Sequence, residues 1–161
     1  MAMTIQTEGL EQLNAMMAEL KDGAMDVAAK ALYAGAGVVG DAFTAAEGRI
    51  ATAPFRYAPP GQTRLPSPEE KAAVTGKSGI AKFHNTGDGV DTLIGISGAA
   101  GYANIAGKPK AVRLIARSIN SGTSFMQKQP VFRKAVSQSS GAAKAATVAK
   151  AEEMFNEIIK A

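Results

Sequence analysis

The stretch that decides the fold is residues 25–47, MDVAAKALYAGAGVVGDAFTAAE. It is rich in alanine and contains no proline, so it predicts a long helix that ends near Gly48. Its glycines weaken an isolated helix but allow another backbone to approach closely. We therefore expect the alanine- and glycine-rich face to be a close-packed contact, with its glycines at Gly35, Gly37 and Gly40.

Helical patterns also occupy the two ends of the chain. Apolar residues at helical spacing predict a first helix from Leu10 to Leu20, and residues 21–23, Lys-Asp-Gly, predict its end. Near the other terminus, Pro130 predicts the start of a C-terminal helix, because its fixed φ suits a first helical turn. Residues 139–141, Ser-Ser-Gly, predict a break within that helix.

Between the helical segments lies a proline-rich stretch, residues 53–68. Its prolines exclude regular structure and predict a long projecting loop with few hydrogen bonds of its own, poorly ordered until a neighbouring subunit fixes it. At its end, Ser67-Pro68-Glu69-Glu70 has the form of a capping box, with serine at N-cap and glutamate at N3. A brief helix should follow, running to about Val74.

The middle of the chain predicts strands, because short apolar or alternating runs there are separated by glycine-rich turns. These runs are residues 80–84, 90–96, 102–105 and 111–119. The sequence thus predicts an α+β fold with an antiparallel sheet of about four strands, packed with two N-terminal helices and a C-terminal helix. We expect residues 1–161 to form a single domain.

Composition and charge limit the functional classes. The 161 residues include no cysteine and no tryptophan, and aromatic residues make up 6%, so the core should be thin or completed by other subunits. No signal peptide or membrane span is predicted, and a cytosolic product is expected. The net charge is +4, and residues 92–151 contain no acidic residue. Such a basic surface is either a solvated face or the partner of phosphate or acidic protein.

Three motifs could indicate chemistry, and none is complete. Residues 35–40, GAGVVG, match the dinucleotide fingerprint but lie inside a helical pattern. Residues 76–78, Gly-Lys-Ser, resemble the end of a phosphate-binding loop, but its first glycine is replaced by Lys71. His84 is the single histidine, without a nucleophile or a carboxylate pair beside it. We therefore predict no catalytic residue, no cofactor and no metal site.

A family resemblance appears in residues 121–126, SGTSFM, and 129–135, QPVFRKA. This segment resembles the tailed-phage tail-completion family of minor tail or head-to-tail joining components, in which a Gly-Thr-Ser turn leaves the last strand and a proline starts the last helix. Gly9-Leu10, Thr75-Gly76 and the strand around Gly95 match upstream parts of the same pattern. The chain departs from the pattern at Ser121, Val131 and Lys134.

The resemblance implies a structural virion protein, not an enzyme. It would form a homo-oligomeric ring, hexameric in the family, in the neck between the head connector and the tail, after assembly in the host cytoplasm. Its implied partners are connector or stopper, tail terminator and tail tube proteins, with DNA in the lumen and no membrane. We expect interaction residues in the proline-rich loop and around the last turn and helix: Arg56, Tyr57, Arg64, Gly122, Thr123, Phe132, Arg133 and Lys134.

Two other functional classes stay open at this point. The acid-free span is compatible with a small basic nucleic-acid-binding protein. His84, with Asp88 and Asp91 close in sequence, is the one feature that would suggest a hydrolase.

Overall fold

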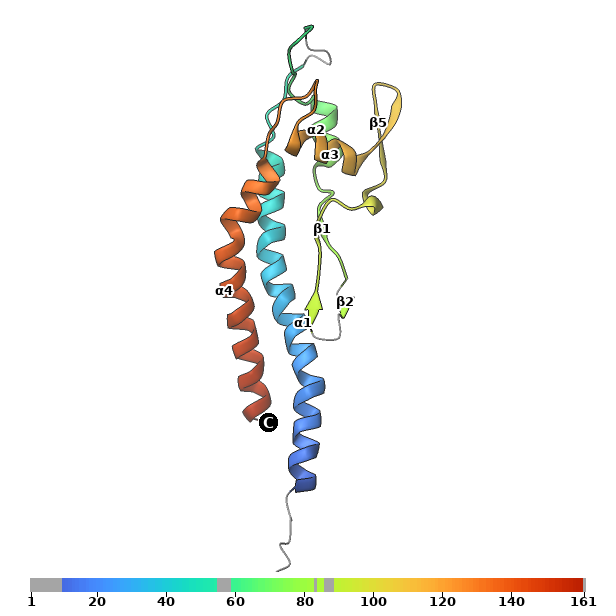
Figure 1. Ribbon diagram of the computed structural model, residues 1–161. Helices are drawn as coiled ribbons and strands as arrows, with labels where there is room; N and C mark the ends of the chain where they lie inside the picture. The colour runs from blue at the N-terminus through green and yellow to red at the C-terminus, as the bar shows by residue number, and fades with distance from the viewer. Residues whose placement is uncertain (1–9, 55–58, 83, 86–88, 161) are drawn as a thin grey trace, which may run out of the picture.

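The computed structural model describes residues 10–54, 59–82, 84–85 and 89–160, and they form an elongated α+β molecule (Figure 1). Two long helices, α1 (Leu10–Gly48) and α4 (Val131–Lys160), lie side by side and run in opposite directions. The shorter helices α2 (Pro68–Val74) and α3 (Val112–Ser121) lie near the end where α1 stops. The strands follow one side of α1. None of the described helices is long and apolar enough to cross a bilayer.

Both predicted helix breaks are wrong. Helix α1 continues through residues 21–23, and α4 continues through residues 139–141. In α4 the Ser139 hydroxyl donates to the Ala135 carbonyl at 2.8 Å, so the serine is satisfied by its own helix. A single glycine costs a helix only about 1 kcal/mol, which packing between two long helices readily offsets.

The close approach of α1 to α4 occurs at Gly35 and not at Gly37. A Cβ atom at Gly35 would lie 2.1 Å from Thr147 Oγ1 and 2.8 Å from the Ala143 carbonyl oxygen. At Gly37 a Cβ would meet no atom within 4 Å. Gly37 is therefore not a packed contact within the described part of this subunit, although the glycine-rich face does meet a second helix.

The core gathers where α1 ends and α4 begins. The rings of Phe43 and Phe132 stack there with centroids 5.2 Å apart. Buried residues of α2, α3 and strand β5 (Tyr102–Ile105) pack around them, among them Val74, Ile105 and Ile119. The lower half of the molecule, by contrast, consists of the two long helices and a narrow strand pair (Figure 1).

The capping box at Ser67 is confirmed. Glu70 N–H donates to the Ser67 hydroxyl at 3.2 Å, and Ser67 N–H donates to the Glu70 carboxylate at 2.9 Å. Helix α2 spans Pro68–Val74, as the sequence predicts. Its exit turn uses Gly76, whose φ is +69° and whose N–H donates at 2.7 Å to the buried Glu47 carboxylate. The Gly-Lys-Ser motif is therefore part of a turn that leads into strand β1 (Gly79–Ile80).

The strands pair two by two, and the described residues form no four-stranded sheet. The antiparallel pairs are β1 (Gly79–Ile80) with β4 (Ile94–Gly95), β2 (His84–Asn85) with β3 (Val90–Asp91), and β5 (Tyr102–Ile105) with β6 (Lys108–Ala111). A single 3₁₀ turn, η1 (Gly98–Ala100), precedes β5. The strand predicted over residues 102–105 is confirmed.

The strand predicted over residues 111–119 is wrong. This segment forms the last residue of β6 and most of α3. Its buried residues follow helical spacing, at Val112, Ile115, Ala116 and Ile119. Arg113 and Arg117, which made the run look alternating, are exposed on the opposite side of the helix.

Candidate assembly surface

The segment that carries the family resemblance forms a tight joint between α3 and α4. Gly122 follows α3 with φ +76°, and a Cβ there would lie 3.0 Å from the Lys128 side chain. Thr123 closes the next turn, because its hydroxyl accepts from Met126 N–H at 3.0 Å. Gln129 fastens the joint to the end of α1 through two 2.9 Å hydrogen bonds with the backbone of Ala51.

Three of the predicted interaction residues serve this joint. Gly122 and Thr123 shape its turn, and Phe132 is 7% exposed in the core against Phe43. Gly122 occupies a helix C-cap and not a strand exit, because α3 replaces the predicted strand. Pro130 lies one residue before α4, where its carbonyl accepts from Lys134 N–H at 3.0 Å. The side chains of Arg133 and Lys134, in contrast, are exposed.

The described part of the proline-rich loop is fixed by hydrogen bonds, contrary to the expectation of few. Arg64 N–H donates to the Phe125 carbonyl at 2.9 Å, and Gln127 N–H donates to the Arg64 carbonyl at 2.8 Å. These bonds form a short parallel bridge to the joint. Two other predicted interaction residues of this loop, Arg56 and Tyr57, lie outside the described residues.

Arg64 turns inward and forms an ion pair with Glu70. The guanidinium donates to the two carboxylate oxygens at 2.6 and 2.7 Å, and the side chains are 11% and 3% exposed. Lys110 Nζ, on β6, lies 3.9 Å from the same carboxylate. This cluster therefore links the loop, α2 and the β5–β6 hairpin, and Arg64 has an internal structural role.

Burial alone would raise the pKa of the Glu70 carboxyl. Hydrogen bonds from Arg64 and the Ser67 amide, with the charges of Arg64 and Lys110, outweigh burial and hold that pKa below its ordinary value. The contribution to stability should be complete above the pKa of an unfolded glutamate, about 4.3, and should be lost as the pH falls through the lower folded pKa.

Acid titration of the unfolding free energy should therefore show a stability loss that depends on Glu70. Urea unfolding measured at intervals below about pH 5 should give a shallower pH dependence for Glu70→Gln than for the unsubstituted protein. Asp41→Asn, which removes an exposed carboxylate on α1, serves as the matched control. Equal slopes for Glu70→Gln and the unsubstituted protein would contradict the assignment.

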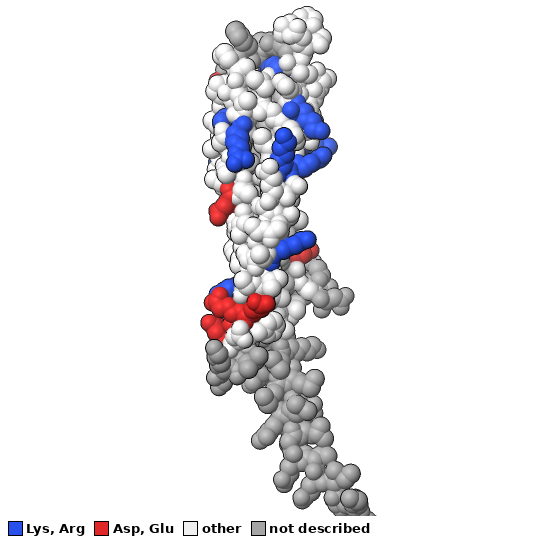
Figure 2. All heavy atoms as spheres, turned by 90° about the vertical axis from the view of Figure 1, so that its left-hand side faces the viewer, with Lys and Arg blue, Asp and Glu red and all other residues white. Residues whose placement is uncertain are grey.

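One face of the molecule is basic at one end and acidic at the other. Figure 2 shows lysine and arginine side chains over the upper half of the α4 side and a group of acidic side chains near its lower end. The exposed cations of α3, the joint and α4 form no ion pair with any described residue: Arg113, Arg117, Lys128, Arg133, Lys134 and Lys144. Close to the end of α4, the Lys150 ammonium instead pairs with Glu153 at 2.7 Å.

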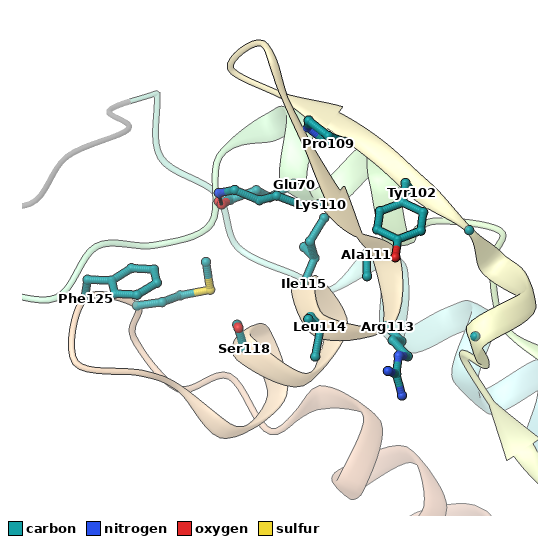
Figure 3. A pocket seen from close by; sticks show the side chains of 13 residues that line it. Glu70, Tyr102, Pro109, Lys110, Ala111, Arg113, Leu114, Ile115, Ser118 and Phe125 are labelled. Carbon is teal, nitrogen blue, oxygen red and sulfur yellow. Dashed lines mark ion pairs between the residues drawn. The ribbon is translucent and has the colours of Figure 1, made fainter.

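A hollow of about 610 Å³ opens between the β5–β6 hairpin, α3 and the joint. We call it the α3 hollow. Figure 3 shows the Tyr102 and Phe125 rings on opposite sides of it, with Leu114 and Ser118 on α3 between them. Tyr102 is 77% and Phe125 53% exposed. Lys110 and Arg113 supply positive charge at its wall, so the hollow combines exposed apolar surface with cations.

Sequence reasoning did not single out Tyr102, and it gave neither Lys110 nor Glu70 a role in a surface or an ion pair. The capping box marked Glu70 as a cap but gave no sign of its ion pair, because Arg64 belongs to an irregular loop. Misreading α3 as a strand concealed the hollow, since Arg113 and Leu114 then seemed to lie on opposite faces of a sheet.

The motifs that could indicate chemistry lie in different elements of the structure. His84 is exposed, with its Nδ1 atom 3.8 Å from the Asp91 carboxylate across the β2–β3 pair. No group of three or more metal-ligating side chains occurs in the described part of the chain. The GAGVVG motif lies within α1, where Gly35 serves helix packing.

No protein-family model, curated protein or solved structure matches this chain. What the chain does must therefore be inferred from its own residues.

Proposed function

We propose that the chain is a structural subunit of a tailed phage, a neck or tail-completion component that forms a ring between the head connector and the tail. The class of assembly is suggested by the resemblance of residues 121–135 to the tail-completion family. In the structure these residues build the joint that starts α4 and presents Arg133 and Lys134 to the surface. The resemblance implies that the ring is hexameric.

The observation that carries the proposal is the apolar surface that the described residues leave exposed. Large apolar side chains on this surface include Leu93 at 79%, Tyr102 at 77% and Phe125 at 53% exposed. Exposed apolar surface of this kind is characteristic of a subunit whose partners complete its burial.

The β5–β6 hairpin offers one way to complete the fold on assembly. It is two-stranded, so both outer edges lack a strand partner among the described residues. Pro109 within β6 is compatible with an edge position. In our proposal a neighbouring subunit adds strands here and extends the antiparallel pair.

Reversing the charge of Arg133 should impair joining without impairing folding. Arg133 is exposed one turn into α4, so Arg133→Glu should change stability by less than about 0.5 kcal/mol. In a phage complementation assay, this variant should allow heads to fill and tail tubes to form but leave them unjoined, as seen by electron microscopy. Lys82→Glu, which makes the same charge change away from the α4 face, is the matched control.

Two outcomes would contradict the proposal for Arg133. Full complementation by Arg133→Glu would remove this helix start from the joining surface. Unfolding of the variant would show that Arg133 is an internal partner. Complementation failure by Lys82→Glu as well would indicate a general effect of charge.

A second candidate function, binding of nucleic acid by a small basic protein, is favoured by the cations on α3 and α4 that form no ion pair within the described part of the chain. Phosphate binding by these side chains would release counterions, so the affinity for random duplex DNA should fall steeply with salt. Salt-dependent DNA binding by the isolated subunit, without co-purification of connector or tail proteins, would favour this candidate over the neck protein.

A further inference from the structure

The α3 hollow and the end of α4 have opposite charge and similar apolar character. The hollow presents Tyr102, Leu114 and Phe125 beside Lys110 and Arg113. The last turns of α4 carry Phe155 among glutamates, and Phe155 is 41% exposed although it also lines a hollow shared with α1. An amphipathic helix end of this kind is a common occupant of an apolar groove whose rim carries the opposite charge.

Helical spacing places acid and aromatic together on α4. Glu152 and Phe155 are three residues apart and so lie on one face of the helix. Glu153 is already paired with Lys150, whereas the exposed Glu152 forms no ion pair with a described residue. Glu152 and Glu157, both exposed and in no ion pair with a described residue, are therefore free to meet a cation, and Glu152 is the one that shares a face with Phe155.

The two surfaces cannot meet within one molecule. Helix α4 starts beside α3 and runs toward the opposite end of the elongated molecule (Figure 1). Glu152 lies roughly 30 Å along the helix axis from Val131 at 1.5 Å per residue. Only a second copy of the chain could bring an α4 end to the hollow.

We propose that the α3 hollow of one subunit receives the acidic end of α4 from a second copy. Arg113 then faces Glu152, and the Phe155 side of the helix covers the exposed rings of the hollow. Because each subunit carries one hollow and one α4 end, the contact is heterologous and repeats around a closed ring or along a filament. The inference rests on the proposed ring assembly and names its contact.

Charge reversal with mixing tests this contact. Arg113→Glu and Glu152→Arg each place like charges opposite one another in a self-association of the variant, so each should weaken self-association about tenfold. In an equimolar mixture of the two variants, each hollow can meet an α4 end of opposite charge. The mixture should therefore associate within about threefold of the unsubstituted protein. Sedimentation equilibrium measures all four affinities.

Lys108→Glu is the matched control, because Lys108 is exposed on the same hairpin but does not line the hollow. It should leave self-association unchanged within about twofold. Thermal unfolding checks that each variant folds, as exposed substitutions usually allow. Raising the salt concentration should weaken association of the unsubstituted protein, because the charges at the rim are partly exposed.

Several results would overturn the contact. The unsubstituted protein could stay monomeric at the highest concentration measured. The single variants could self-associate as tightly as the unsubstituted protein, or the mixture could fail to recover the affinity that the single variants lose. Loss of duplex DNA binding in Arg113→Glu with normal self-association would assign the hollow to DNA instead. If the protein forms rings and complements the phage, and these substitutions change neither ring formation nor complementation, the contact is refuted while the proposed function is left intact.

Discussion

Arg64→Ala should be among the most destabilising single substitutions in this chain. The change removes the guanidinium that donates to both oxygens of the Glu70 carboxylate, a side chain that is 3% exposed with Arg64 in place. Breaking a buried pair by removing one partner typically costs about 3–5 kcal/mol. Chemical denaturation at neutral pH should show this loss as a lower midpoint with an unchanged slope.

Matched variants separate charge from packing. Arg117→Ala removes an exposed arginine of α3 and should change stability by less than about 0.5 kcal/mol. Arg64→Met with Glu70→Leu replaces both charges by apolar side chains and should recover only part of the loss, because the hydrogen bond from Ser67 N–H to Glu70 is lost as well. A loss below about 1 kcal/mol in Arg64→Ala would mean that water compensates the carboxylate, and the cluster would not hold the loop to α2.

Local signals predicted the parts of the fold that local interactions determine. The capping box of α2 depends on residues three positions apart, so Ser67 and Glu70 suffice to specify it. The hairpin strand at residues 102–105 and the helical context of the GAGVVG motif were also predictable from a short window. In each case the partner that stabilises the element lies close in sequence.

Predictions failed where distant partners decide the structure. Residues 112–119 have an apolar pattern that fits a loosely alternating strand, but its helical spacing matches the core formed by α1, α2 and α4. The breaks expected at residues 21–23 and 139–141 ignored the support that two antiparallel helices give each other. Local propensity is a weak prior, and tertiary packing overrode it at these positions.

The candidate surface was predictable only in part. The acid-free span in the sequence indicated the basic character of the α3 and α4 face, and Arg133 is exposed there as expected. Arg64 carries the same charge, yet it faces Glu70 inside the molecule. Nothing in an irregular proline-rich loop indicates which of its cations turns inward, because no periodicity relates such residues to a face.

The sequence likewise does not indicate which glycine of α1 meets α4. Substitution of that glycine is the second change for which we expect a large effect. Gly35→Ala should destabilise the protein by about 1–3 kcal/mol, because the added methyl group overpacks the contact with α4. The methyl would lie 2.1 Å from Thr147 Oγ1, whose hydroxyl donates to the Ala143 carbonyl at 2.9 Å. That carbonyl oxygen would itself lie 2.8 Å from the methyl, so rotating Thr147 cannot relieve the clash.

Gly37→Ala is the matched control. Gly37 lies two residues further along α1, and a methyl group added there would have no described atom beyond its own stretch of helix within 4 Å. It should stabilise the protein by about 0.4–1 kcal/mol, because alanine loses less backbone entropy in a helix than glycine does. Thermal and chemical unfolding of the two variants should thus shift in opposite directions. Equal stabilisation by both would show that α1 and α4 are not held at this separation in solution. Equal destabilisation would instead mean that Gly37 also meets another backbone, as the sequence pattern predicts and as a neighbouring subunit could provide.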